Sequence, residues 1–292
     1  MAADRLTASL PQSQVERARA LANGDYAVAP ARHASTVVLL RPGAAGHEAY
    51  LLRRVQAMAF AGGMHVFPGG SVDPADASSD VGWAGPPPSW WAAQFGADEP
   101  LGRALVCAAV RETFEESGIL LAGPSADTLL SDVSSDEWEE ERRALEAREQ
   151  SLSELLTRRG LLLRADLLRP LAHWITPELE PKRFDTRFFL AELPAGQVCR
   201  PVGGEADERH WVRPVDALAG GFRLMPPTVA VLADLAGCSD IAAALAAQRT
   251  IKAILPRIVV AADGSVQVLT TDAEVPAGPA DPVLAADPAL QD

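Results

Sequence analysis

Three glutamates lie close together in the segment RETFEESG, residues 111–118. Glu112, Glu115 and Glu116 are spaced i, i+3 and i+4, so on a helix their side chains project from one face. Two carboxylates about 6 Å apart repel each other by roughly 3 kcal/mol at an effective dielectric constant of 20. Bound Mg²⁺ or Mn²⁺ reverses this repulsion, because hard cations prefer oxygen ligands. The segment predicts a divalent-cation site, although three glutamates alone also fit a solvated acidic face.

The residues before this segment predict the elements that must position it. Apolar side chains recur near helical spacing through residues 101–117, and Gly118 stands where a helix C-cap is expected. Upstream, AFAGGMHVFPGGSVDPAD, residues 59–76, reads as a glycine-rich loop around a short strand. Between the two, residues 78–100 contain Gly, Pro and Trp too densely for regular structure. We interpret this stretch as an insertion.

GGSVDPAD and RETFEESG together resemble the Nudix box. Its usual form is Gly, five residues, Glu, seven residues, then Arg-Glu-apolar-x-Glu-Glu-x-Gly-apolar. Asp76 stands at the Glu position, as a counterpart of that residue or only as a capping group, and Thr113 replaces the usual apolar residue. Thirty-four residues separate Asp76 from Arg111, and a loop insertion at about 77–103 explains the surplus without moving the metal face. The other positions are filled by Gly70, Arg111, Glu112, Glu115, Glu116, Gly118 and Ile119.

The long insertion, the preceding HVFPGG and the later TPELEPKRFDTRFF resemble the Nudix branch that includes peroxisomal coenzyme A diphosphatases. In the pattern upstream of FPGG, Arg54 and Gly63 fit, whereas Ala59 stands where a second arginine is expected. The resemblance implies hydrolysis of coenzyme A or acyl-coenzyme A to 3',5'-ADP and a 4'-phosphopantetheine. Alternatives are a pyrophosphatase for ADP-ribose, NADH or a dinucleoside polyphosphate, and a non-catalytic nucleotide-sensing Nudix domain. Such sensing domains typically lose one or more of the box glutamates, and this chain keeps all three.

The resemblance also implies roles for the site residues. Glu112, Glu115 and Glu116 are the expected ligands of Mg²⁺ or Mn²⁺, which would neutralise a diphosphate and lower the pKa of the attacking water. Arg111 is expected to orient a ligand glutamate through a bidentate ion pair. The catalytic base is either Glu115 itself or a loop acid, for which the candidates are Glu205, Asp207 and Glu208.

Substrate contacts are expected from the glycine-rich loop and from the PKRFDTRFF segment. Candidate binding residues are Arg54, His65, Gly69, Gly70, Arg183 and Arg187. The two later arginines either bind phosphates or are surface charges on a strand edge, and His65 either bonds substrate or is structural. The tryptophans at 83, 90 and 91 either stack on adenine or pack the insertion against the core.

The predicted fold is an α/β class Nudix α/β/α sandwich with a mixed sheet, a loop insertion and additional helices. We divide the chain into an N-terminal extension (1–30), a Nudix domain (31–271) with helical elaboration at about 125–168, and a mobile tail (272–292). A hairpin is expected at 34–40 and 49–52. Other strands are expected at 171–175, 186–190 and 209–212, one or two solvated helices within 136–159, and helices at 214–218, 228–235 and 241–247.

Composition narrows the classes of partner. A formal net charge of -13 argues against a nucleic-acid surface, which needs a basic stripe to release counterions. No run approaches the roughly 18 apolar residues of a membrane span, so a cytoplasmic location is the default expectation. The three cysteines are far apart and read as small hydrophobes. The expected partner is a small nucleotide substrate, and a homodimer is expected from the habit of the family.

Overall fold

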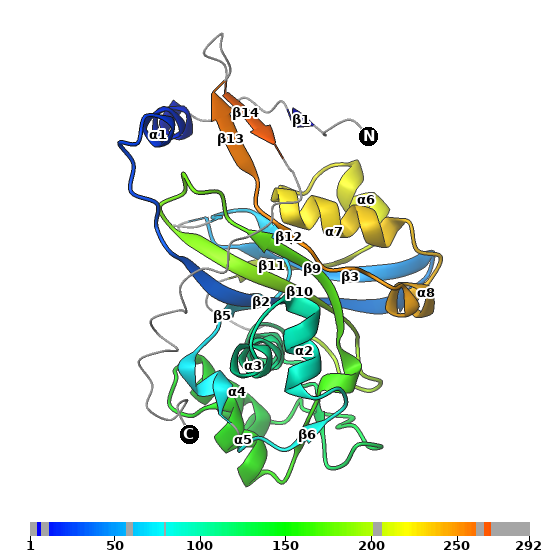
Figure 1. Ribbon diagram of the computed structural model, residues 1–292. Coiled ribbons are helices and arrows are strands. Elements are labelled where there is room, and N and C mark those ends of the chain that lie inside the picture. The colour runs from blue at the N-terminus through cyan, green and yellow to red at the C-terminus, as the bar shows by residue number, and fades with distance from the viewer. Residues whose placement is uncertain are drawn as a thin grey trace.

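A computed structural model describes residues 5–6, 12–56, 61–78, 80–200, 206–260 and 266–269. Within these residues, a mixed eight-stranded sheet forms the centre of the molecule (Figure 1). Its main path is β11 (Ala206–Val212), β3 (Gly46–Arg54), β2 (Ala31–Gly43), β10 (Arg183–Glu192), β9 (Arg169–Ile175) and β12 (Ala253–Ile254). Two short strands, β4 (His65–Val66) and β5 (Gly69–Ser71), pair with β3 and β2 respectively. The predicted hairpin and the three later strands are confirmed.

The predicted helices at 101–117, within 136–159 and at 214–218, 228–235 and 241–247 are confirmed, whereas the first two of the helices named next, α1 and α2, were not predicted. The α-helices are α1 (Gln12–Ala22), α2 (Pro88–Phe95), α3 (Glu99–Ser117), α4 (Asp136–Glu146), α5 (Leu152–Arg158), α6 (Pro214–Ala219), α7 (Pro226–Ala236) and α8 (Ile241–Ala246). Two 3₁₀ turns are η1 (Pro74–Ala77) and η2 (Ala165–Leu167). The structure also has two three-stranded sheets. One has the strand order β6 (Trp83–Ala84), β8 (Leu162–Arg164), β7 (Ala122–Gly123). The other has the order β1 (Arg5–Leu6), β14 (Val266–Leu269), β13 (Arg257–Val260). The predicted tail, 272–292, lies outside the described residues.

Period-two alternation along the strands divides the core into two layers. On β2, Val37 and Leu39 belong to the cluster that includes α2 and α3, whereas Val38 and Leu40 belong to the cluster under α6, α7 and α8. Figure 1 shows α2 to α5 on one side of the sheet and α6 and α7 on the other. Both faces of the sheet are therefore covered, and the α/β/α sandwich with a mixed sheet is confirmed.

Helix α3 carries the glutamate segment and is fixed at both ends. The Asp98 carboxylate accepts the Leu101 N–H at 2.9 Å, and Gly118 ends the helix with φ +74°, a conformation that favours glycine. The Ser35 hydroxyl on β2 donates to the Leu105 carbonyl at 2.6 Å, which ties α3 to the sheet. Thr113 is fully buried, and its hydroxyl donates to the Ala109 carbonyl at 2.7 Å. A polar residue is tolerated at this box position because that bond satisfies it.

The stretch at about 77–103 differs from its prediction. We expected no regular structure there, but it contains β6, α2 and the first turn of α3. Proline opens α2 and Gly96, at φ +63°, ends it, so these residues mark element boundaries instead of an irregular loop. Trp91 is fully buried and stacks on Phe95 with ring centroids 6.3 Å apart. For Trp91, packing against the core is therefore confirmed.

Helices α4 and α5 are less solvated than predicted. Ion pairs cover one face, but Leu145, Leu155 and Leu156 are buried on the other. Arg142 is also buried, and its Nη1 donates to the Glu115 carbonyl at 2.9 Å. The charge pattern of residues 136–159 thus describes only the outer faces of an amphipathic pair.

We predict that Gly102→Ala destabilises the fold. A Cβ at position 102 would lie 2.7 Å from the Ala92 nitrogen and the Pro88 carbonyl oxygen, so α2 and α3 must separate. Such overpacking costs about 1–3 kcal/mol, measurable by urea unfolding. Gly237→Ala is the control, since its φ is −78° and its new Cβ would lie at an ordinary 3.4 Å from the Asp234 oxygen. Equal stability of the two variants would contradict the close packing.

Candidate metal and nucleotide site

Arg111 joins helix α3 to the loop that follows β5. Its Nε and Nη2 donate to the two carboxylate oxygens of Asp76 at 3.0 and 2.9 Å, and Nη2 also donates to the Ser71 carbonyl at 2.9 Å. Asp76 is buried and accepts the Asp73 N–H, which completes the capping box of η1. Asp76 therefore acts both as a cap and as the bidentate partner of Arg111.

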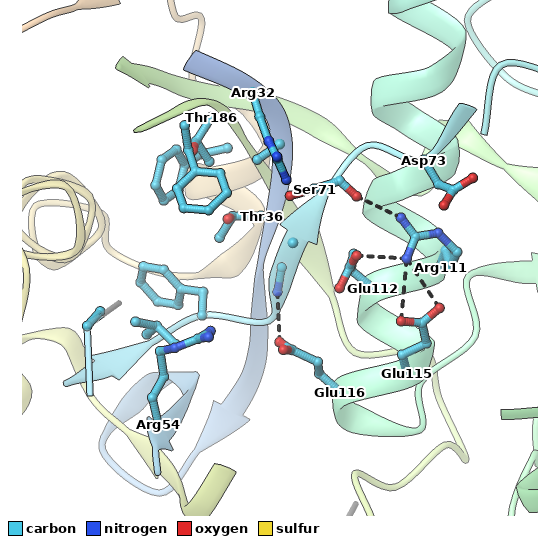
Figure 2. A pocket seen from close by; sticks show the side chains of 18 of the residues that line it. Arg32, Thr36, Arg54, Ser71, Asp73, Arg111, Glu112, Glu115, Glu116 and Thr186 are labelled. Carbon is cyan, nitrogen blue, oxygen red and sulfur yellow. Dashed lines mark hydrogen bonds and ion pairs between the residues drawn. The ribbon is translucent and has the colours of Figure 1, made fainter. Parts of the chain in front are cut away.

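Two of the three box glutamates lie on the opposite side of the same guanidinium. Arg111 Nη1 donates to Glu112 at 2.7 Å and to Glu115 at 3.2 Å (Figure 2). The third, Glu116, accepts the backbone N–H of Gly69 at 2.8 Å. The helix spacing thus brings all three side chains to the lining of one pocket, although their carboxylate oxygens do not all lie within 4.8 Å of one another.

Glycines allow the β5 backbone to approach these acids. A Cβ at Gly70 would lie 2.5 Å from Glu112 Oε1, and one at Gly69 would lie 2.5 Å from the Ser35 carbonyl oxygen. Neither space admits a side chain. Gly70 therefore lets β5 lie against the Glu112 carboxylate, and Gly69 lets β5 lie against β2.

Electrostatics favours an additional cation. Burial raises the pKa of Glu112 and of Glu115, and the Arg111 guanidinium only partly opposes this. Burial alone would lower the pKa of Arg111, but Asp76 and the two glutamates outweigh it and raise that pKa. A single guanidinium does not neutralise this many carboxylates. The cluster of hard oxygen donors fits Mg²⁺ or Mn²⁺.

A pocket of about 1200 Å³ opens beside the carboxylates. Figure 2 shows Arg32, Thr36 and Thr186, from β2 and β10, across β5 from Glu115. The basic groups on the sheet side of the wall are Arg32, Arg54 and Lys182, and the apolar part of the wall includes Phe67, Trp174, Phe184, Phe188, Met225 and Pro226. The pocket combines an acidic end with basic groups and a broad apolar surface, a combination suited to a nucleotide.

Known proteins are similar to this chain in fold and in sequence. No family model matches the chain. A solved structure of a Nudix hydrolase from Alicyclobacillus acidocaldarius is 31% identical, and the match covers 77% of this chain and 99% of that one with a TM-score of 0.65. The chain belongs to the Nudix hydrolase family. The resemblance inferred from the box is confirmed, as is the prediction of a Nudix pyrophosphohydrolase, and members of this family typically depend on divalent metal ions.

Two curated relatives carry a more specific name. This Nudix hydrolase is 28% identical over 291 residues to acyl-coenzyme A diphosphatase NUDT19 of Gallus gallus, covering 81% of this chain and 75% of the relative. It is 27% identical over 207 residues to the protein of the same name from Xenopus laevis, covering 59% of this chain and 54% of the relative. The match thus spans about half of the frog protein.

Several of the predicted binding residues line the pocket of this Nudix hydrolase. Arg54, Gly69 and Gly70 do so. His65 and Gly63 instead line a smaller hollow on the other face of β3 and β4, so they are not brought to the carboxylates. The Ala59 position lies outside the described residues.

His65 lies in a polar cluster on that other face. One ligand atom each of His65, Glu208 and His210 can be chosen so that all three lie within 4.8 Å of one another. However, His65 Nδ1 accepts the Arg223 N–H at 3.2 Å, which leaves the proton of the neutral ring on Nε2. The nitrogen facing the cluster is then a donor, which favours a hydrogen-bonded group over a cation site.

Arg183 and Arg187 do not reach the pocket. Both are buried: Arg183 donates to the Thr176 and Ala29 carbonyls, and Arg187 pairs with Asp185 at 2.7 Å. Although burial would raise it, hydrogen bonds from two histidines and the charge of Arg187 hold the pKa of Asp185 well below its usual range. The two arginines are therefore neither surface charges nor pocket residues, and their position gives no support to a role in phosphate binding.

Two of the acids considered as loop bases, Asp207 and Glu208, lie in strand β11 and not in a loop. Asp207 pairs with Arg53 in a bidentate geometry at 2.8 and 3.1 Å, and Glu208 contacts the same guanidinium at 2.6 Å. Neither residue lines the pocket that holds the carboxylates. Glu205 lies outside the described residues. Among the candidate bases that the structure describes, Glu115 is the one that lines the pocket.

The sequence did not reveal Arg32, Thr36, Lys182 or the aromatic wall. These residues meet because β10 lies parallel to β2, a pairing between distant segments. One signal was present: in RFDTRFF, residues 184, 186 and 188 alternate with the three charged residues 183, 185 and 187. Since alternate residues of a strand face opposite sides, the aromatic positions and the arginines could not share one surface.

We predict that Arg111→Lys lowers stability by about 2 kcal/mol or more, because an ammonium group cannot reproduce the fork that serves Asp76, Ser71 and Glu112. Unfolding in urea without substrate measures this. Arg143→Lys is the matched control, since that side chain is 70% exposed and should leave stability unchanged. A loss confined to activity, with both variants equally stable, would refute the structural part of the role of Arg111.

Proposed function

We propose that this Nudix hydrolase is a divalent-metal-dependent diphosphatase that cleaves coenzyme A or acyl-coenzyme A into 3',5'-ADP and a 4'-phosphopantetheine. One observation carries the proposal. The carboxylates of Glu112, Glu115 and Glu116 meet basic and apolar walls in a single large pocket. The similarity to two acyl-coenzyme A diphosphatases supports the choice of substrate.

The three glutamates would hold Mg²⁺ or Mn²⁺. When bound, such a cation neutralises a diphosphate and lowers the pKa of the attacking water. The protein contributes orientation: Arg111 fixes Glu112 and Glu115, and the Gly69 N–H fixes Glu116. Glu115 and Glu205 stay as candidate bases.

The remaining walls suit the two ends of such a substrate. Arg32, Arg54 and Lys182 offer positive charge to phosphate oxygens, and the aromatic wall offers apolar area to a base or an acyl chain. Pockets for drug-sized ligands typically measure about 300–1,000 Å³. A pocket of about 1200 Å³ is large enough for a substrate bigger than a simple nucleotide.

We predict that Glu115→Gln and Glu116→Gln each abolish Mg²⁺-dependent hydrolysis while the fold stays intact. Each change removes a charged ligand yet keeps the shape of the side chain. Chromatography of the products formed with and without Mg²⁺, together with circular dichroism, measures both properties. Glu99→Gln, an exposed change in the first turn of the same helix and outside the pocket, should retain wild-type turnover. Wild-type turnover in either box variant would overturn the assignment of the cluster.

A substrate panel tests the specific activity. The wild-type enzyme should cleave coenzyme A and acyl-coenzyme A with a higher kcat/KM than NADH, ADP-ribose or diadenosine polyphosphates, because the apolar wall is matched by the pantetheine or acyl end. Chromatography of the products identifies 3',5'-ADP. Cleavage of ADP-ribose with coenzyme A left intact would refute this substrate and leave the family assignment standing.

A further inference from the structure

Arg148 occupies a backbone position that usually belongs to glycine. Helix α4 ends in a Schellman motif, in which the Arg148 N–H donates to the Leu145 carbonyl and the Glu149 N–H to the Ala144 carbonyl, both at 2.8 Å. The residue between these bonds must be left-handed, and Arg148 has φ +57°. A side chain in this region clashes with its own backbone, so arginine costs free energy here relative to glycine.

The rest of the chain follows the usual preference. Left-handed residues at the ends of α2, α3 and α5 are Gly96, Gly118 and Gly160. Ala61 and Arg148 are the two non-glycine residues with positive φ among the described residues, and both line the large pocket. Backbone strain of this kind concentrates at functional sites, where the side chain has a use that offsets the cost.

The Arg148 side chain is available for a ligand. It is 81% exposed, and its ion pair with Asp73 is long, at 3.8 Å, so it contributes little to stability. Of the acids near it on the same wall, Glu146 pairs with Arg142 and Glu154 accepts the Ser151 N–H, whereas Glu149 follows Arg148 directly in the chain. The turn between α4 and α5 thus presents a positive charge beside the loop that carries Asp76.

Arg148 lies on a different wall from the other basic groups of the pocket. Arg32, Arg54 and Lys182 come from β2, β3 and the residue before β10, whereas Arg148 comes from the helical pair α4 and α5. Resting on the proposed function, we propose that Arg148 is a specificity-determining residue that binds a phosphate group of the nucleotide substrate. That phosphate belongs either to the cleaved diphosphate or to a further phosphate on the ribose.

Steady-state kinetics of Arg148→Gly with coenzyme A and with dephospho-coenzyme A tests this assignment. Glycine suits the left-handed backbone, so the variant should fold and its Tm should equal or exceed that of the wild type. We expect KM to rise about tenfold, as for the loss of one charge-assisted hydrogen bond, with kcat little changed. A rise in KM for coenzyme A alone would show that Arg148 binds the ribose phosphate. A rise in KM for both substrates would show that it binds the diphosphate. The KM of Arg148→Lys should lie between that of Arg148→Gly and that of the wild type.

Two controls keep the outcomes separate. Arg143→Gln removes an exposed arginine of the same helix that does not line the pocket, and it should leave KM unchanged. An unchanged KM for both substrates in Arg148→Gly, with the wild type active, would overturn the inference. Wild-type enzyme that cleaves neither substrate would instead refute the proposed function, and Arg148→Gly would then be tested on the nucleotide of the panel that is cleaved.

Discussion

Arg111 is bonded on two sides, and the site exists because both sets of bonds form on one guanidinium. One side holds the Ser71 carbonyl at the end of β5 and Asp76 in η1, and the other holds Glu112 and Glu115 on α3. A largely enclosed guanidinium satisfied in this way fixes the helix against β5 and η1 without any cation present. Glu112 and Glu115 are consequently held beside one guanidinium before a metal ion arrives, and folding offsets the free-energy cost of their repulsion.

Local patterns in the sequence predicted much of this arrangement, because the responsible interactions are local. Glu112, Glu115 and Glu116 are neighbours on a helix whatever the rest of the fold does, and Gly118 ends that helix by its own backbone preference. The failures concern contacts between distant segments. The burial of Arg187 depends on which face of β10 meets the pocket, and α2 depends on packing against α3. The charged residues and turn residues of the sequence do not directly indicate the burial of Arg187 or the packing of α2 against α3.

The sheet separates two kinds of polar chemistry by alternation alone. Along β10, the pocket receives the side chains of 184, 186 and 188, while Asp185 and its basic partners lie on the other face. Neighbouring residues thus serve binding and stability independently. The helical pair α4 and α5 also contributes to the site. Arg142 of α4 donates to the Glu115 carbonyl, and Arg148, in the turn between the two helices, lines the pocket.

The parallel pairing of β2 with β10 also constrains how the protein is made. Ala31 pairs with Arg183 and Leu40 with Glu192, so every segment of the Nudix box is synthesised between two strands that are not yet neighbours. A ribosome extends the chain from the N-terminus, and long-range pairing is slow compared with helix formation. Helix α3 can form early, but its sheet partner is complete only after β10 emerges. A nascent chain truncated before residue 183 should therefore carry the box residues without an assembled site.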